Sequence, residues 1–555
     1  MDFQKELINL LKRETKLKEI KLEIPHDTRL GDFAFPCFEL SKEKKKSPFL
    51  ISQELAKSIK KPIFISQIIS NGPYLNFFLD INKFAQETLN KIQIKKQDYG
   101  KFVKKEKVMV EFSQANTHKA FHVGHVRGTS LGESISRIIE FSGSKIIRAN
   151  YQGDTGMHVA KWIWCYTKYH PKEKIISDEK WIASIYVDAV KRLVENPELQ
   201  IEVDKINENL YKKDNKKLNE LWSRTRKLSL NSFEKIYKEL NTRFDFYFFE
   251  SRVEKRGKEI ANELVRKKLA KISEGATIIE LEKYGLGVWV LLRKDGTILY
   301  SSKDLALAEQ KFNKLNINKS IYVVGAEQRL HVNQLFKTLE LMKFKYAKNC
   351  YYIPVSEVRL PTGKMSSRTG DNIIYSDFIK DVKNYAKSEI TKREKLNKTE
   401  LEKRSLAISI SAIKYSMLKQ NPNHTIIFNK EESLNFEGNT GPYLLYSYAR
   451  AKSILDKSKN KKVRFKIIKI EDNERELINL LSSFPNVVLN AYNNLSPNII
   501  ANYAHEISQK FNEFYHSNKV IGTKEEAFRL ALVESFSIVL KNSLYLLGIN
   551  TIEKM

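Results

Sequence analysis

The segment Val108-Met109-Val110-Glu111-Phe112, followed ten residues later by the turn His122-Val123-Gly124-His125, decides the fold of this 555-residue chain. The short apolar run predicts a buried strand, and the residues from Gly128 to Phe141 have the apolar pattern of a helix. Residues 145–149 predict a second strand, and residues 150–156 a second polar turn that contains glycine. Two successive strand-turn-helix units indicate an open parallel sheet, which binds ligands at the carboxyl ends of its strands.

Outward from this segment, the patterns predict several domains, as the length of the chain also suggests. Residues 1–90 resemble a small α+β domain, with an amphipathic first helix and a closing strand. Residues 106–404 are expected to form a Rossmann-like α/β domain with a parallel sheet and a helical insertion at about 160–275. Residues 405–555 have long amphipathic patterns and predict an all-α bundle.

The second half of the expected sheet depends on two further apolar runs. Gly287–Leu292 and Ser320–Gly325 are both rich in β-branched residues and have strand length. Both are therefore predicted to belong to the parallel sheet.

The charge of the chain favours a polyanionic partner. The 96 Lys and Arg residues exceed the 66 Asp and Glu residues by 30. Nucleic acid is the first interpretation, an anionic membrane surface the second, and a biased composition the third. A basic stretch before Lys107 fits a solvated linker or helix face, and it also fits a contact with phosphate.

The cysteines and the N-terminal residues indicate the cellular compartment in which we expect the protein. Cys37, Cys165 and Cys350 lie far apart and form no Cys-x-x-Cys pair, so we expect neither a zinc site nor a disulfide framework. The N-terminal residues have no apolar signal region, and no run of about 18 apolar residues occurs. We expect a cytoplasmic protein without a membrane partner.

The turn at His122–His125 is the first candidate for chemistry. A helix N-terminus offers backbone N–H groups to phosphate, and Gly124 would let a ligand approach the backbone. The imidazoles of His122 and His125 could donate hydrogen bonds as charge accumulates during displacement at phosphorus. The alternative interpretation of this short motif is a chance pair of structural histidines.

A second candidate is the loop Gly363–Gly370. It contains Lys364, Met365, Ser366, Ser367 and Arg368 between two glycines. Cationic and hydroxyl donors suit a leaving pyrophosphate, and a mobile loop can provide contacts that are absent from the ground state. Taken alone, the segment could equally be an exposed basic loop.

Together the two motifs resemble the HIGH and KMSKS signatures of class I aminoacyl-tRNA synthetases. Within that class the chain resembles the arginyl-tRNA synthetases along nearly its whole length. The similar segments are Glu111–His122, Asn150–Gly156, Tyr300–Asp304 and Glu437–Tyr443, with Gly31–Pro36 near the N-terminus and Leu547–Ile549 near the C-terminus. In that family the N-terminal domain is taken to meet the tRNA elbow, and the C-terminal helices bind the anticodon.

The resemblance assigns roles to individual residues. The expected catalytic residues are His122, His125, Lys119 and Lys364, and ATP binding is expected at His122, Gly124, His125, Lys364, Met365, Ser366, Ser367 and Arg368. Arginine binding is expected at Glu111, Gln114, Ala115, Asn116, Lys119, His125, Glu250, Tyr300, Asp304 and Gln328. A guanidinium needs carboxylates in bidentate geometry, and Tyr300 and Asp304 share one helix face. Without the resemblance, Tyr300 and Asp304 would be an ordinary first helical turn and Gln328 a surface amide.

The chain departs from the family pattern at a few positions. Ser367 stands where the second KMSKS lysine is common, Thr155 where tryptophan is common, and Gln114-Ala115 where Ser-Pro is common. Our hypothesis is that Lys119, with Lys364 or Arg368, provides the missing charge.

The resemblance implies a two-step reaction. The arginine carboxylate attacks the α-phosphorus of ATP, which is used with Mg²⁺, and a terminal ribose hydroxyl of the tRNA for arginine then takes the arginyl group. The family suggests a monomer with no tightly bound cofactor, and a carboxylate-lined pocket needs no editing site. The rivals are another nucleotidyltransferase, a non-catalytic tRNA-binding relative and a cysteinyl enzyme, which would have clustered Cys and His.

Overall fold

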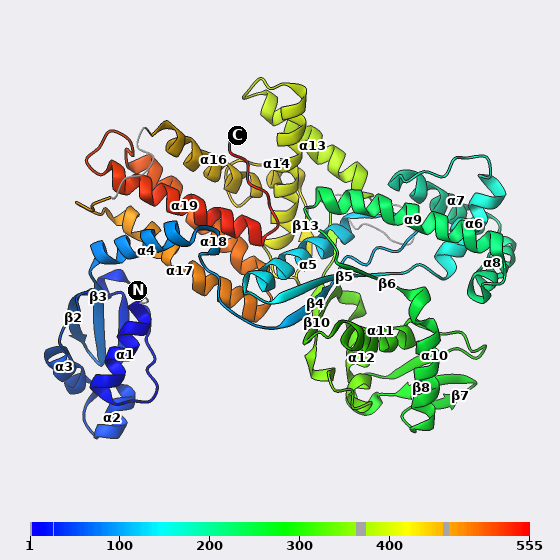
Figure 1. Ribbon diagram of the computed structural model, residues 1–555, viewed down its shortest axis with the longest axis horizontal. Coiled ribbons are helices and arrows are strands. Elements are labelled where there is room, and N and C mark those ends of the chain that lie inside the picture. Colours follow the sequence, from blue (N-terminus) through cyan, green and yellow to red (C-terminus); the bar gives the residue numbers. More distant parts are fainter. Residues whose placement is uncertain (1–2, 26, 362–372, 459–464) are drawn as a thin grey trace. The chain divides into compact units, whose positions relative to one another are not determined.

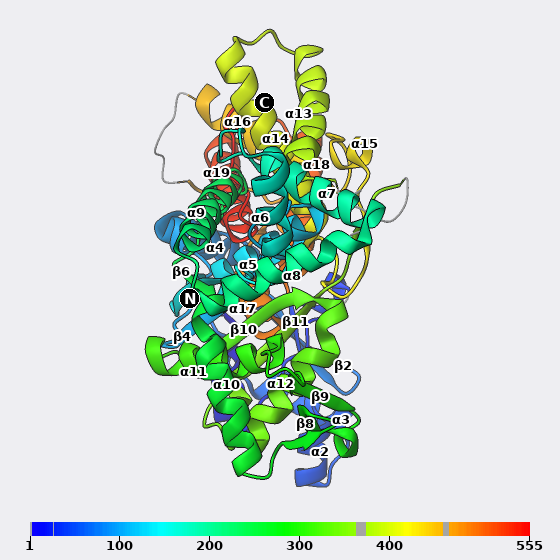
Figure 2. The same cartoon turned by 90° about the vertical axis from the view of Figure 1, so that its right-hand side faces the viewer.

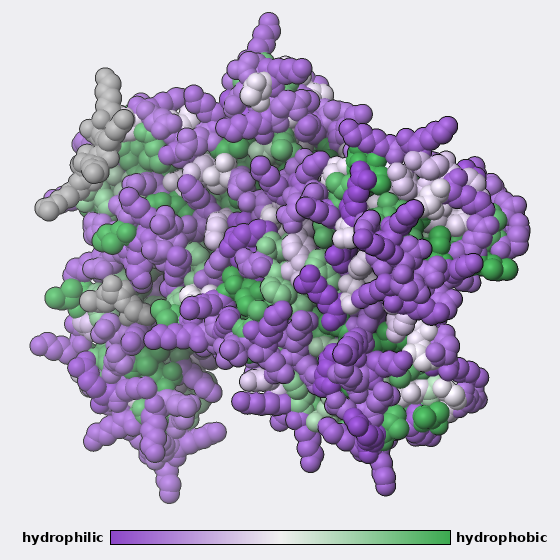
Figure 3. Space-filling model, turned by 45° about the vertical axis from the view of Figure 1, so that its right-hand side comes forward, coloured by the Kyte–Doolittle hydropathy of each residue, from purple (hydrophilic) through white to green (hydrophobic). Residues whose placement is uncertain are grey.

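The computed structural model describes residues 3–25, 27–361, 373–458 and 465–555. The chain divides into two compact units. The first comprises Met1–Tyr99, Ala451–Phe484 and Ile507–Val539, and the second comprises Gly100–Arg450, Pro485–Glu506 and Leu540–Met555. Hydrophilic side chains cover most of the face seen in Figure 3. In the described part of the chain, no helix has both the length and the apolar character that a membrane span requires.

The N-terminal residues of the first unit form the predicted small α+β structure. Leu7 and Leu11 recur at helical spacing and bury one face of the first helix, which explains the amphipathic pattern. The strands pair antiparallel in the order β1-β3-β2. The elements are α1 (Phe3–Thr15), η1 (Thr28–Leu30), β1 (Phe33–Pro36), α2 (Phe38–Lys44), α3 (Pro48–Ser58), β2 (Ile65–Asn71), β3 (Tyr74–Leu79), α4 (Ile81–Lys95) and η2 (Lys96–Asp98).

The parallel sheet predicted from the Val108–Phe112 segment lies in the second unit (Figure 1). Its order is β11-β10-β4-β5-β6, and each neighbouring pair is parallel. The chain enters at the central β4, moves outward through β5 and β6, and returns on the other side, so the order reverses between β4 and β10. A ligand site is therefore expected at the carboxyl ends of these strands. The bounds are β4 (Lys107–Glu111), β5 (Lys145–Gln152), β6 (Phe246–Phe249), β10 (Lys319–Gly325) and β11 (Cys350–Val355).

Helices connect these strands. The helix after β4 begins at Val123, so the prediction of a start near Gly128 is wrong. His122 lies in extended conformation before the helix, and the first helical turn contains Val123, Gly124 and His125. The connecting helices are α5 (Val123–Phe141), α10 (Glu250–Arg266), α11 (Tyr300–Leu315) and α12 (Arg329–Leu341), with η6 (Ala347–Asn349) before β11.

A group of helices is inserted between β5 and β6. It is built around the buried side chains of Trp162 and Trp164, and Figure 2 shows its helices lying together. β6 and α10 fall inside the range expected for the insertion, but β6 is a strand of the parallel sheet. The inserted elements are α6 (Met157–Tyr169), α7 (Glu179–Glu195), η3 (Pro197–Leu199), α8 (Gln200–Lys212) and α9 (Lys216–Glu239).

One strand expected in the parallel sheet lies elsewhere. Residues 288–292 form β9, which pairs antiparallel with β8 in a separate sheet. Val288 and Val290 are exposed while Trp289 and Leu291 are buried. This alternation is typical of an antiparallel strand with one covered face, so the assignment to the parallel sheet is wrong. The sheet consists of β7 (Lys271–Ser273), β8 (Ala276–Glu280) and β9 (Val288–Leu292), with η4 (Glu282–Tyr284) between β8 and β9.

The described C-terminal residues, 405–458 and 465–555, form mainly helices, as predicted, and include one strand of two residues. That strand, β13, pairs in parallel with β12. One of the points at which the chain passes from one unit to the other falls inside α17 at Pro485, which has no N–H to donate to the helix. The elements are β12 (Val358–Arg359), α13 (Tyr375–Thr391), α14 (Lys398–Leu418), β13 (Ile426–Ile427), α15 (Lys430–Ser433), α16 (Gly441–Lys457), α17 (Asp472–Asn494), α18 (Pro497–Ser517) and α19 (Glu526–Leu546).

Candidate active site

Two imidazoles stand at the N-terminus of α5. The backbone N–H of His122 donates to Nδ1 of His125 at 3.1 Å, and the ring centres are 3.8 Å apart. Because Nδ1 of His125 accepts, the proton of the neutral ring is on Nε2. His122, Gly124 and His125 are all only partly buried, so a ligand can reach the turn and its backbone N–H groups.

Both imidazoles are neutral at physiological pH. Burial lowers the pKa of His122 to about 4, and the charge of Lys119 adds to this effect. Burial also lowers the pKa of His125 well below its ordinary value, helped by His122 and Lys119. These rings are therefore suited to donate hydrogen bonds to an anion and are poor general acids.

Lys119 lies beside this turn and is half-buried. Burial lowers its pKa, and Lys161 adds a smaller effect. Its Nζ is 5.1 Å from the centre of the Tyr186 ring, and no carboxylate of the described residues forms an ion pair with it. A half-buried cation without a carboxylate partner favours an anionic ligand, such as a phosphate or the carboxylate of an amino acid.

The loop after β4 has an unusual backbone. Ser113, Gln114 and His118 have φ angles of 78°, 48° and 63°, which non-glycine residues rarely adopt. Such conformations persist where the surroundings fix them, and they are frequent at functional sites. Ala115 is buried in this loop, and Gln114 is partly buried.

Gly153 follows β5 and has no side chain, so the loop after β4 and the start of α10 can both lie against it. The side chain of Asn116 lies so close to this glycine that an added Cβ atom would overlap it. The same Cβ atom would lie 3.3 Å from Oε1 of Glu250. Thr117 donates its backbone N–H to the Gly153 carbonyl at 3.1 Å and so docks the first loop on the second. Asn116 and Glu250 therefore come together, although they are far apart in sequence.

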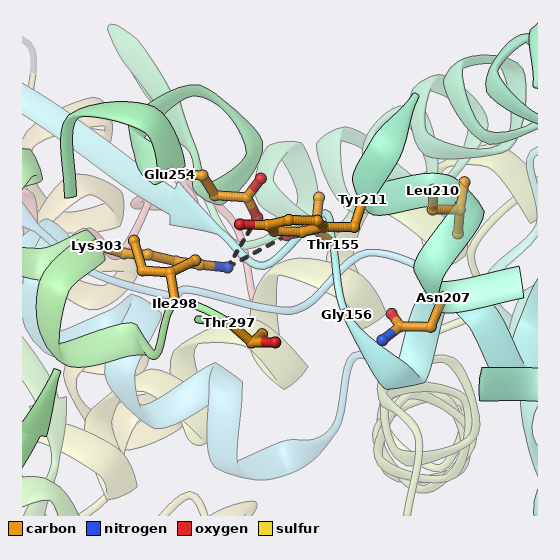
Figure 4. Close-up of a pocket in the computed structure, with 9 residues that line it drawn as sticks. All are labelled: Thr155, Gly156, Asn207, Leu210, Tyr211, Glu254, Thr297, Ile298 and Lys303. Carbon is orange, nitrogen blue, oxygen red and sulfur yellow. Dashed lines mark hydrogen bonds and ion pairs between the residues drawn. The ribbon is translucent and has the colours of Figure 1, made fainter. Parts of the chain in front are cut away.

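Glu250 begins α10 and is paired with a lysine. Lys303 Nζ lies 2.9 Å from Glu250 and 3.0 Å from Glu254. Figure 4 shows Lys303 facing Glu254 and Thr155 beside a small cavity. Burial raises the pKa of Glu250, and the charge of Lys303 opposes that change.

Asp154, at the end of β5, fixes the start of α10. It accepts hydrogen bonds from the backbone N–H and the hydroxyl of Ser251, at 3.0 and 2.7 Å. Its charge is balanced by Arg226 of α9 at 2.6 Å. The carboxylate thus positions the residue next to Glu250 and links the sheet to the insertion.

Asp304 is the second carboxylate near the carboxyl edge of the sheet. Tyr300 and Asp304 lie in the first turns of α11, as predicted, and α11 leads into β10. Asp304 Oδ2 is 2.6 Å from Nε2 of His331. Trp289 donates its indole N–H to Nδ1 of His331 at 3.3 Å, so the imidazole proton is on Nε2 and points at Asp304. The ring of Tyr300, which is 59% exposed, packs against His331.

Glu111, in contrast, is closed off from solvent. It is 2% exposed, and its Oε2 lies 2.8 Å from Nζ of Lys311. Lys311 also lies 3.7 Å from the centre of the Tyr322 ring. Burial raises the pKa of Glu111, and Lys311 opposes the change. Glu111 therefore ties β4 to α11 beneath the site.

Comparison with known proteins identifies the family of the chain. Residues 88–430 match the model of the class I tRNA synthetase (R) catalytic domain, residues 444–555 that of the DALR anticodon binding domain, and residues 2–79 that of the arginyl tRNA synthetase N-terminal domain. The chain belongs to the arginyl-tRNA synthetase family. Its catalytic domain is that of a class I ligase that uses ATP and charges tRNA with arginine.

Full-length relatives agree with this assignment. The chain is 37% identical to an arginine–tRNA ligase of Clostridium acetobutylicum over 541 residues, which covers 96% of each protein. It is 35% identical to that of Clostridium perfringens over 570 residues, covering both proteins completely.

Solved synthetase structures share the fold. The Thermus thermophilus arginyl-tRNA synthetase superposes with a TM-score of 0.82 at 24% identity, over 100% of this chain and 99% of that one. The Plasmodium falciparum enzyme gives a TM-score of 0.77 at 21% identity, with the same coverage. The expected multidomain fold with a Rossmann-like parallel sheet is confirmed.

The remaining expected site residues are Gln328 and those of the Gly363–Gly370 segment. Gln328 ends η5 (Ala326–Gln328), directly after β10, and is exposed. It lies near the carboxyl end of β10, where the site is expected. Lys364, Met365, Ser366, Ser367 and Arg368 lie outside the described residues.

Several side chains that pair with the predicted site residues were not predicted from the sequence. Lys303 and Asp154 lie inside segments that resemble the synthetase family, so the resemblance contained the signal for both. Lys311 and His331 carry no local signal, because only the packing of α11 and α12 on the sheet brings them to Glu111 and Asp304.

Proposed function

We propose that the carboxyl edge of the parallel sheet binds ATP and L-arginine and forms arginyl adenylate there. The ATP phosphates lie against His122, Gly124 and His125. The arginine guanidinium lies between Glu250 and Asp304, with Tyr300 beside it, and Asn116 holds the α-amino end. ATP enters as its Mg²⁺ complex, which is the substrate form.

One observation supports this proposal best. A pair of neutral imidazoles and the half-buried Lys119, which has no carboxylate partner among the described residues, stand at the N-terminus of α5, where an anion is stabilised. The carboxylates Glu250 and Asp304 belong to neighbouring elements of the same sheet edge. A site with anion donors at one end and carboxylates at the other suits a triphosphate next to a cationic amino acid.

The chemistry requires positioning more than proton transfer. A carboxylate oxygen of arginine attacks the α-phosphorus, and the bond to the bridging oxygen breaks as pyrophosphate leaves. Neutral imidazoles donate to the phosphoryl oxygens as charge accumulates, and Lys119 compensates the added charge. A ribose hydroxyl of the tRNA end then attacks the arginyl carbonyl carbon, and AMP leaves. No covalent intermediate with the protein is needed.

The domain roles belong to the same proposal. Residues 1–90 contact the tRNA outside its acceptor end, residues 106–404 perform both chemical steps, and residues 405–555 bind the anticodon. The surplus of 30 positive charges supports a polyanionic partner of this kind. The active form is proposed to be a monomer.

ATP–pyrophosphate exchange with each amino acid, with and without tRNA, tests the proposal. Of the amino acids, only arginine should drive exchange. The His122→Ala, His125→Ala double variant should exchange at least about 100-fold more slowly, the typical effect of removing such donors. Exchange driven by another amino acid, or full activity of the double variant, would refute it.

A further inference from the structure

Glu179, a carboxylate of the helical insertion, contacts the segment that pairs with the chain at His122. Glu179 is the first residue of α7 and is 7% exposed. Its Oε2 accepts the backbone N–H of Ser376, in the first turn of α13, at 3.1 Å. The backbone N–H groups of Tyr375 and Phe121 also act on this carboxylate. Glu179 therefore holds the start of α13 directly, and it acts on the chain just before α5 through that segment.

These two segments are themselves paired. Tyr375 donates its backbone N–H to the Phe121 carbonyl at 2.8 Å, and His122 forms an isolated β-bridge with Ile374. The Phe121 ring lies 5.1 Å from the ring of His125, measured between centres. The direction of both imidazoles thus depends on where the segment at residues 374–376 is held.

A second acidic side chain of the insertion holds the same segment. The hydroxyl of Tyr375 donates to Oε2 of Glu239, on α9, at 2.9 Å. Glu179 and Glu239 both line a cavity between α7, α9, α13 and α14. The other charged groups that line it are Asp178, Lys235, Lys380 and Lys383. Lys180 pairs with Asp377 and also interacts electrostatically with Glu179.

The contacts of Glu179 suit a charged acceptor. Burial raises its pKa to about 7, and the N–H groups of Ser376, Tyr375 and Phe121 oppose the change. The ionised carboxylate accepts from the backbone N–H of Ser376 and attracts the two neighbouring N–H groups, whereas the protonated form carries no charge and loses one acceptor position to its own proton. The strength of the contact therefore varies with pH close to neutrality.

We propose that Glu179 is a positioning residue for ATP activation, which holds Phe121 and the first turn of α13 so that His122 and His125 face the phosphates. The inference rests on the proposed function of the His122 turn. It assigns a task to the insertion: α7 sets the geometry of the nucleotide turn from outside the parallel sheet.

The test compares Glu179→Gln with Glu195→Gln in exchange assays on the full chain with tRNA. Glu195 lies on the same helix, is exposed and pairs with Lys191 at 3.9 Å. Glu179→Gln should lower kcat/KM for ATP about 10-fold, the effect of one hydrogen bond to a charged group, and leave KM for arginine within about twofold. Glu195→Gln should behave as the wild type.

A pH series separates positioning from general loss of structure. The advantage of the wild type over Glu179→Gln should be small at about pH 6 and complete at about pH 8, because only the ionised carboxylate accepts fully. An equal loss at both pH values, an equal rise of KM for arginine, or wild-type kinetics would overturn the inference.

Two further results keep the test decisive. If Glu179→Gln does not fold, the test is the pH dependence of KM for ATP in the wild type. This KM should fall as the pH rises from about 6 to about 8, and a constant value over that range overturns the inference. If the His122→Ala, His125→Ala variant keeps its exchange activity, the proposed function fails. If only that double variant loses activity, the proposed function stands and the role of Glu179 is refuted.

Discussion

Asp304→Asn gives the most direct test of the proposed arginine pocket. Asp304 is partly exposed, and one of its oxygens accepts from His331 at 2.6 Å. Trp289 donates to the other nitrogen of that imidazole, so His331 is a neutral donor and the negative charge of Asp304 remains available. Its second oxygen is free to accept from a guanidinium.

The expected effect follows from this geometry. Asparagine keeps the size of the side chain and can still accept from His331, but it removes the charge and turns an NH₂ group toward the ligand. The loss of one charge-assisted hydrogen bond costs about 1.5–3 kcal/mol, which corresponds to a rise of about 10- to 150-fold in KM for arginine. KM for ATP should stay within about twofold.

Pyrophosphate exchange with arginine as the varied substrate and tRNA present measures this effect. Asp381→Asn is the matched control, because Asp381 is an exposed carboxylate that pairs with Lys430 at 2.9 Å. The reasoning is refuted if KM for arginine of Asp304→Asn stays within about twofold of the wild-type value. It is also refuted if the control shows the same rise.

Three further predictions concern the turn, its helix and the core. Lys119→Ala should lower the exchange rate at least about 10-fold while tRNA still binds, since Lys119 has no carboxylate partner among the described residues; near-normal exchange would contradict its role. Gly132→Ala should destabilise the protein by about 1–3 kcal/mol because the new methyl group overlaps the Phe112 ring, whereas Gly128→Ala on the same helix has open space and should stabilise it slightly; thermal melts compare the two. Burial lowers the pKa of Lys414 to about 7, so the unfolded chain binds a proton that the folded chain lacks between about pH 7 and pH 10. The unfolding midpoint should rise with pH in that window, and it should rise less in Lys414→Met.

The sequence predicted the strands and helices whose formation depends mainly on neighbouring residues. Residues 108–111 form a strand of the parallel sheet because all four are buried, and a continuous apolar run is typical of a strand covered on both faces. The start of α11 at Tyr300 was also predicted. The start of α5 was not, because the chain at Phe121 and His122 is fixed by Ile374 and Tyr375, about 250 residues away in sequence.

The strand at Val288–Leu292 was assigned to the wrong sheet for a related reason. A short apolar run predicts a strand, but pairing depends on which neighbours the chain brings to it. Here the hairpin partner β8 lies only a few residues before β9, and local pairing prevails.

The site predicted from the sequence was incomplete because its charged side chains pair with residues that are far away in sequence. Residue types and family resemblance pointed to Glu111, Glu250 and Asp304. Only the folded chain pairs Glu111 with Lys311 and provides Asp304 with His331. Sequence therefore predicts which side chains carry charge at the site, but not which of them are already neutralised.

This balance bears directly on amino-acid selection. Lys303 lies between Glu250 and Glu254, so the three groups together retain one negative charge when both carboxylates are ionised. Asp304 adds another, since its partner His331 is neutral, whereas Glu111 and Lys311 cancel. An apolar amino acid would leave these charges desolvated without a partner, which costs far more than the loss of a methylene contact. In the proposed binding mode a guanidinium donates to both Glu250 and Asp304, whereas the ammonium of lysine presents a single point of charge. In the proposed site, arginine is selected through carboxylates that no cation of the protein neutralises, and Lys303 determines how many of them there are.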